Sequence, residues 1–207
     1  MKKLIFALSI IFLTLSCESK IVEPTINYEK VTDYYPLSIG NYWVYKVYTV
    51  DSNNNYREHV EVDSLYVEKD SLINGKIYKL VRGTFLSELY LLRDSSNYLV
   101  TAEGKKLLTT NKTDESLAKR TYSGQGLDFE LTTKMNPIDS TFNTPSGNYK
   151  CKFVKSTLKC LSPNSTYNDR KGFYAYSKGV GMIGRKMSYL LSDLYVEMKL
   201  IRYDVKY

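Results

Sequence analysis

The sequence has very few of the residues from which most catalytic sites are built. Its 207 residues include one histidine, one tryptophan and three cysteines. A Ser–His–Asp or Cys–His site would need His59 as its base, because the chain has no other imidazole. His59 shares one predicted strand face with Glu61 and Asp63. Three such side chains could contact a cation, but a solvated face is the commoner meaning, so we predict no metal site.

Dinucleotide-binding motifs are missing as well, since the paired glycines of the chain lack a strand–GxGxxG–helix context. Paired carboxylates stay open as an alternative, because the two acids of a glycoside hydrolase need only meet in space. Asp128 and Glu130 are one same-face pair, although 22 acidic residues produce such pairs by chance. We therefore predict no catalytic residue, no cofactor and no enzymatic activity, with a cell-envelope hydrolase as the alternative.

The chain has no apolar run long enough to cross a membrane as a helix. The longest run, residues 4–15, would span about 18 Å of a hydrocarbon core that is about 30 Å thick. It follows two lysines and precedes Ser16-Cys17, which is the layout of a secretory signal. We expect residues 1–16 to be a signal peptide.

Residues 13–17 (LTLSC) resemble a bacterial lipobox, whose cysteine becomes the lipidated first residue of the mature chain. The usual pattern has leucine three residues before the cysteine, where this chain has Thr14 between two leucines. The resemblance predicts lipid attachment at Cys17 and anchoring in the cell envelope. Glu18 stands where some lipoproteins have aspartate, which favours the outer membrane. An ordinary signal peptide that leaves Cys17 as a free thiol is the alternative.

Positive charge is not concentrated anywhere in the chain. The net charge of +7 falls to +5 when Lys2 and Lys3 leave with the signal peptide, and no arginine-rich block exists. Together with export, this excludes nucleic acid as an expected partner. The expected partners are the membrane, through Cys17, and either an apolar small molecule or an envelope protein.

Residues 17–33 are polar and contain Pro24 but little pattern, so we predict a lipid-anchored flexible tether there. Residues 34–207 then form one β domain, which is long enough to bury a sizeable core. The chain has 20 tyrosines against seven phenylalanines. Tyrosine favours strands, so we expect most of these rings to cover strand faces, with a ligand groove as the alternative.

From residue 34 onward the apolar pattern has a period of two, which is typical of strands. Asn74-Gly75 lies between two such runs and predicts a type I′ hairpin turn. The only predicted helix covers residues 113–120. Strands are expected over residues 41–50, 58–69, 85–93, 97–101, 127–134, 148–160, 172–177 and 194–206.

The apolar face changes parity within two of these strands, between Phe153 and Val154 and between Leu200 and Ile201. One extra residue at each point, a β-bulge, would keep a single face buried. Long bulged strands bend. The predicted fold class is therefore mainly β: a single antiparallel, strongly curved sheet or open half-barrel with little helix.

Cys151 and Cys160 lie nine positions apart on one predicted strand, with no turn residue between them. That separation is about 30 Å, whereas a disulfide needs Cα atoms within about 7 Å. We expect two free thiols.

Three segments resemble a group of uncharacterised bacterial lipoproteins. Residues 35–45 (YPLSIGNYWVY) match their YxPLxxGNxWxY opening, residues 176–183 match KGVGxI, and residues 144–151 are similar to TPxGxFxC. Such proteins look like single antiparallel β domains, of the curved half-barrel kind found in periplasmic lipoprotein carriers of the LolA/LolB type. The resemblance implies a fold and no activity. The expected function is a membrane-anchored, non-catalytic binding or structural module.

Overall fold

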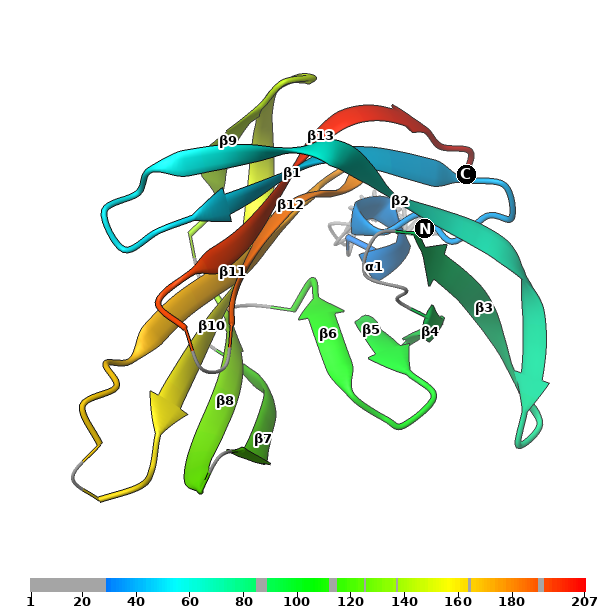
Figure 1. Cartoon of the computed structure of the whole chain (residues 1–207). Coiled ribbons are helices and arrows are strands. Elements are labelled where there is room, and N and C mark those ends of the chain that lie inside the picture. The colour runs from blue at the N-terminus through cyan, green and yellow to red at the C-terminus, as the bar shows by residue number, and fades with distance from the viewer. Residues whose placement is uncertain are drawn as a thin grey trace, which may run out of the picture.

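The computed structural model describes residues 29–84, 89–111, 115–124, 126–136, 138–163, 165–189 and 192–207. These residues form one helical turn, α1 (Val31–Tyr34), and otherwise strands (Figure 1). The predicted mainly β fold class is confirmed. The strands are β1 (Tyr42–Val50), β2 (Tyr56–Ile73), β3 (Lys76–Gly83), β4 (Leu89–Ser95), β5 (Tyr98–Thr101), β6 (Lys106–Thr109), β7 (Ser116–Gly124), β8 (Leu127–Met135), β9 (Ser140–Thr144), β10 (Gly147–Cys160), β11 (Arg170–Ser177), β12 (Gly181–Ser188) and β13 (Tyr195–Asp204).

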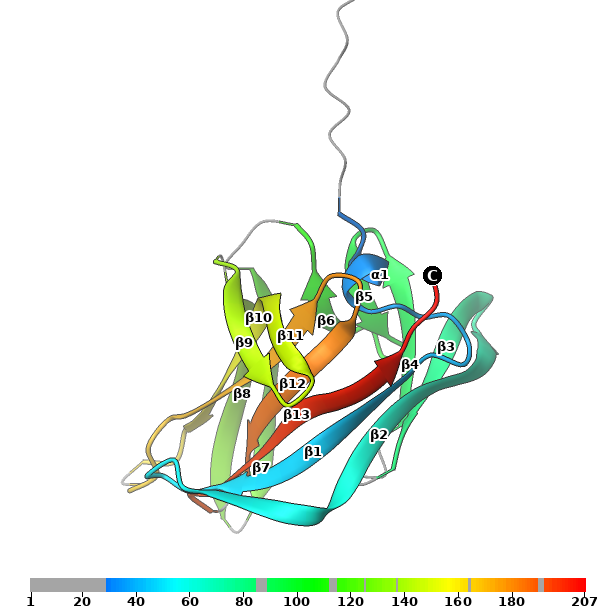
Figure 2. The ribbon, with the colours of Figure 1, turned by 90° about the horizontal axis from the view of Figure 1, so that it is seen from above.

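All thirteen strands belong to one antiparallel sheet. Its order is β6-β5-β4-β3-β2-β1-β13-β12-β11-β10-β8-β7, and β9 pairs separately with β10. The sheet curves until it is a nearly closed barrel, whose ends β6 and β7 approach each other (Figures 1 and 2). No ladder joins β6 to β7 in the described ranges. We call this gap between β6 and β7 the seam.

The hairpin prediction at Asn74-Gly75 is confirmed. Both residues have positive φ, 49° and 71°, and they connect β2 directly to β3. The predicted helix over 113–120 is wrong, because residues 116–124 form β7, while 112–114 lie outside the described residues. Alternate residues of β7 face inward and it pairs along its length with β8, so tertiary contacts decide the structure of a segment too short to be a stable helix alone.

One of the two predicted bulges is present. Val44 lies opposite Arg202 and the next residue, Tyr45, lies opposite Leu200, so Ile201 is the extra residue between them. This confirms the bulge expected at 200–201. The bulge lies at the centre of the sheet, where β1 and β13 meet.

The bulge expected at 153–154 is wrong. β10 keeps a regular register with β11 through both positions. Phe153 packs edge-on against Phe142 of β9 and Phe173 of β11, with ring centroids 6.1 and 5.5 Å away. Val154 is buried and points to the opposite face. The parity change therefore marks a strand that is covered on both faces, because the β9 hairpin packs over one of them.

The core centres on Trp43, which is fully buried. Its Nε1 donates a hydrogen bond to the carbonyl oxygen of Val180 over 2.6 Å, as expected of a buried indole. Tyr35 follows α1 and packs against Trp43 with ring centroids 5.3 Å apart. Residues 35–45 and 176–183, which carry the family resemblance, therefore pack against each other.

α1 lies inside the curve of the sheet, at one end of the barrel (Figure 2). Val31 of this turn is fully buried, and the amide of Gly179 donates to the carbonyl oxygen of Asp33 over 2.8 Å. The predicted signal peptide, Cys17 and residues 18–28 of the predicted tether lie outside the described residues, so the division into 1–16, 17–33 and 34–207 stays a prediction, although residues 31–33 belong to α1 and pack with the domain. None of the described helical residues forms a segment long and apolar enough to span a membrane. Cys151 and Cys160 are free thiols on β10, as expected.

Candidate functional site

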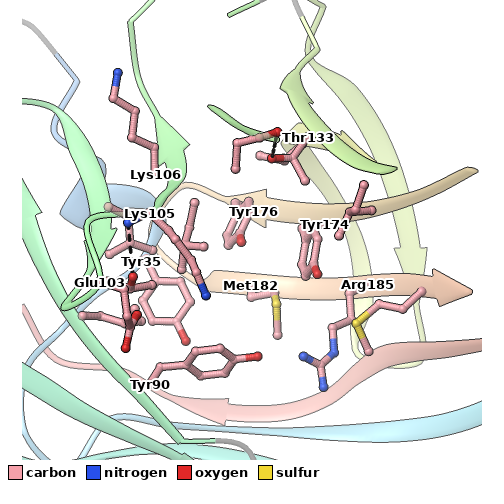
Figure 3. A pocket seen from close by; sticks show the side chains of 18 of the residues that line it. Tyr35, Tyr90, Glu103, Lys105, Lys106, Thr133, Tyr174, Tyr176, Met182 and Arg185 are labelled. Carbon is pink, nitrogen blue, oxygen red and sulfur yellow. Dashed lines mark hydrogen bonds between the residues drawn. The ribbon is translucent and has the colours of Figure 1, made fainter. Parts of the chain in front are cut away.

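The curved sheet encloses a cavity of about 450 Å³ (Figure 3). This volume lies in the range of pockets that bury small organic ligands. Strands β2, β4, β5 and β6 wall one side of the seam, and β7, β8, β10, β11 and β12 wall the other. The cavity therefore depends on most of the sheet and adjoins its only unladdered junction among the described strands.

Apolar side chains make up most of the wall. Methionines and a valine face them from β10 and β12. Leucine is the commonest lining residue, with seven members: Leu65, Leu89, Leu91, Leu92, Leu99, Leu107 and Leu131. Such a wall excludes water and favours alkyl or aromatic ligand groups, by about 25 cal/mol for each Å² of apolar surface buried.

Five of the 20 tyrosines also line the cavity, namely Tyr35, Tyr90, Tyr122, Tyr174 and Tyr176. The hydroxyl groups of all but Tyr122 can be followed into the cavity in Figure 3. Burial raises the pKa of Tyr176 well above its ordinary value, so its hydroxyl stays protonated. A quarter of the tyrosines thus line the cavity, and the other described tyrosines lie outside it.

Arg185 is the most deeply buried charged residue of the wall, with 1% of its surface exposed. Its Nη2 lies 3.7 Å from Oδ2 of Asp63, which is fully buried, and its Nε lies 2.9 Å from the sulfur of Met198. The other carboxylate oxygen of Asp63 accepts hydrogen bonds from the amide and hydroxyl of Thr84, over 3.1 and 3.2 Å. Such partners are what a buried ion pair needs to offset its desolvation. They fix the guanidinium at the cavity wall.

The predicted solvated face of His59, Glu61 and Asp63 is wrong. The register of β2 against β1 shifts across residues 59–61, so His59 and Asp63 do not share one regular strand face. Nε2 of His59 lies 2.7 Å from the hydroxyl of Thr49, Glu61 is exposed, and Asp63 is buried against Arg185. The described part of the chain contains no group of three or more histidine, cysteine and acidic residues placed to hold a metal ion.

Asp128 and Glu130, the example of a carboxylate pair, are held by different partners. The hydroxyl of Ser123 donates to Asp128 over 2.6 Å, and Lys119 lies 2.7 Å from Glu130. Neither acid lines the cavity, where Glu103 is the single carboxylate. The geometry therefore does not bring Asp128 and Glu130 together at the cavity.

Sequence reasoning missed the basic residues of the wall. Arg185 lies in the segment GMIGRKMS, which has no clear period of two and forms β12. The available signal was an arginine directly after four apolar or small residues. A charged residue in such a run is expected to be buried with a partner. Lys105 gave no signal, because it lies in an ordinary polar turn between β5 and β6.

Comparisons with known proteins add information on the fold. No protein-family profile and no curated protein matches the sequence. The chain is similar to the crystal structure of a protein from Bacteroides fragilis, assigned as exported and described as having a YmcC-like fold. The identity is 13%, the TM-score is 0.53, and the match covers 83% of this chain and 98% of the other. A structure from Parabacteroides distasonis, assigned as a lipoprotein, matches over the same shares with 14% identity and a TM-score of 0.45.

At this level of identity the first similarity shows a shared fold alone. It covers nearly all of the Bacteroides chain, so the whole curved sheet is the shared unit. The similarity agrees with the architecture implied by the three sequence segments. It assigns no role to the cavity, whose meaning has to come from its own residues.

Proposed function

We propose that this chain is a lipid-anchored cell-envelope protein without catalytic activity, and that its cavity binds an apolar small molecule. The single observation that carries the binding role is the 450 Å³ cavity with its leucine and tyrosine wall. A small domain gains stability by filling its interior, so an open apolar volume of this size has a cost that a bound ligand would remove. The anchor at Cys17 and an outer-membrane position are parts of the same proposal.

The binding role is tested by mass spectrometry of the organic extract from protein purified under native conditions. Residues 18–207 contain every residue that the structure describes, so this form retains the complete sheet. We expect an apolar molecule that copurifies in a stoichiometric amount. An extract free of such molecules, together with no uptake of added apolar probes, would contradict the binding role and favour a protein-facing scaffold.

The anchor is tested separately on the full chain expressed in a bacterial host. The intact mass of membrane-extracted protein should show loss of residues 1–16 and addition of acyl chains, because these chains hold the protein in the bilayer. The Cys17→Ser variant should lose both the added mass and the membrane association. An unmodified N-terminus in the native chain would contradict the lipid anchor and would not affect the cavity proposal.

A further inference from the structure

The charged groups of the cavity wall are unequal in sign. Lys105, Lys106, Arg120 and Arg185 are basic, and Glu103 is the one acidic lining residue. A purely apolar ligand would need none of these groups, and a ligand that covered their charges would incur a desolvation cost. The excess of basic groups therefore indicates that the ligand has a polar part as well as an apolar one.

Two of the four basic groups are paired with carboxylates that lie outside the lining. Lys106 Nζ lies 3.0 Å from Glu115, and Arg185 Nη2 lies 3.7 Å from Asp63. The ion pairs formed by the described residues include neither Lys105 nor Arg120. A hydrogen bond from the Thr101 hydroxyl lowers the pKa of Glu103, so this carboxylate is ionised and offsets one of the two charges. One positive charge is left over at the wall.

The polar ends of the lining side chains are mostly hydrogen-bond donors, and several converge. Figure 3 shows the Lys105 ammonium extending into the cavity while the neighbouring Lys106 points away. The hydroxyls of Tyr35, Tyr90, Tyr174 and Tyr176 face the same space, and the Arg185 guanidinium lies across it. Ammonium and guanidinium groups only donate, and a protonated phenol donates one hydrogen. The complement of such a set is a group with several acceptor oxygens and a negative charge.

We propose that the ligand is a single-chain amphiphile with an anionic head, whose carboxylate or phosphate oxygens accept hydrogen bonds from Lys105 and the surrounding tyrosine hydroxyls. This inference rests on the proposed binding function. The leucine wall holds the alkyl chain, and Arg185, fixed by Asp63, adds positive potential to the head site. A volume of about 450 Å³ suits one chain better than the two chains of a diacyl lipid.

Calorimetric titration of residues 18–207 with three probes tests this inference. Laurate, dodecyl phosphate and dodecanol share one alkyl length and differ in the head. We expect at least one anionic probe to bind about tenfold more tightly than dodecanol, because hydrogen bonds to charged groups are stronger than neutral ones. The ratio of laurate to dodecyl phosphate affinity then distinguishes a carboxylate head from a phosphate head.

A lysine variant locates the head. Lys105→Gln should weaken binding of the preferred anionic probe by about tenfold and leave dodecanol affinity unchanged, because only the head loses a charged donor. Lys155→Gln, an exposed position on β10 outside the cavity, is the matched control and should change neither affinity.

The outcomes separate the two proposals. If dodecanol binds as tightly as both anionic probes, the anionic head is wrong and the apolar cavity stands. If Lys105→Gln binds the anionic probe as well as the native chain does, the assignment of the head to Lys105 is overturned. If none of the three probes binds, the proposed binding function itself fails.

Discussion

Trp43 and Gly181 show that part of the two resembling segments, 35–45 and 176–183, serves folding rather than a site. A Cβ atom on Gly181 would lie 2.7 Å from Trp43 Nε1, and the residue has φ +109°, which side chains rarely adopt. Trp43 needs this space because its indole reaches past Gly181 to the carbonyl oxygen of Val180. Neither residue lines the cavity. Trp43 and Gly181 therefore serve the core, whereas Tyr35, Tyr176 and Met182 of the same segments line the cavity.

Substitution of Gly181 tests this account. Gly181→Ala should lower the free energy of unfolding by about 3 kcal/mol, because it combines a strained backbone with a clash against a fully buried ring. Gly75→Ala is the control: φ is also positive, at +71°, but no atom lies within 4 Å of the added carbon. It should cost only about 1 kcal/mol. Urea unfolding of both variants measures the difference, and equal losses would contradict the clash.

At the residue scale the sequence indicated the core better than the cavity wall. A single histidine was enough to limit catalytic chemistry, and a tryptophan beside Gly40-Asn41 indicated the core. The cavity wall was hidden, because its residues come from separate strands and their inward direction depends on the register of each ladder. Asp63 shows the effect: the register shift of β2, in which residues 59–61 lie opposite Val47 alone, separates it from the expected solvated face, and it is a buried partner of Arg185.

The seam is the element that most distinguishes this barrel from a closed one. β6 and β7 approach without a ladder, and Glu115, just before β7, provides side-chain links across the gap. Its carboxylate accepts a hydrogen bond from Tyr98 over 2.8 Å and pairs with Lys106 at 3.0 Å. Burial alone would raise the pKa of Glu115, but the bonds from Lys106 and Tyr98 outweigh it and the pKa is lowered.

The lowered pKa of Glu115 gives the seam a defined pH dependence. The contribution of Glu115 is complete above the ordinary pKa of a glutamate and is lost as pH falls through the lowered folded-state pKa. Glu115→Gln should therefore reduce the free energy of unfolding by about 0.5 kcal/mol at pH 7 and by almost nothing at strongly acidic pH. Urea unfolding at both pH values measures this.

Hydrogen exchange locates the part of the sheet that Glu115→Gln destabilises. At pH 7 the Glu115→Gln variant should exchange faster in β6 and β7. Glu130→Gln, which breaks a pair with Lys119 inside the β7–β8 ladder, is the matched control and should leave β6 unaffected. Unchanged protection of β6 in both variants would argue against a seam held by Glu115.

At the element scale the predictable strands were those with an alternating face and a turn signal. β1, β2, β8 and β13 have such patterns, and Asn74-Gly75 fixes the turn between β2 and β3. Four strands were not predicted. β12 contains two glycines and two basic residues, β6 and β9 are only four and five residues long, and β7 has local helix propensity that its ladder with β8 overrides.

For the molecule as a whole, the position of the cavity couples ligand binding to the free energy of unfolding. A ligand held by nine strands stabilises only the intact barrel, so saturating ligand should raise Tm. Ala118→Trp adds a large ring to the cavity wall on β7 and should reduce both copurified ligand and the Tm increase on ligand addition. Thr121→Trp is exposed on the same strand outside the cavity and should retain both. Equal ligand content in the two variants would place the ligand elsewhere.

The pairing of β1 with β13 also sets when this protein can fold. Partners such as Trp43 and Tyr203 are 160 positions apart, yet they lie side by side at the centre of the sheet. Contacts at such separation form slowly, because a long loop must close before they contribute. A chain whose β13 has not yet been synthesised lacks the strand on which β1 depends. The complete sheet therefore forms only once β13 is present, which makes loss of Tyr195–Asp204 more damaging than its length suggests.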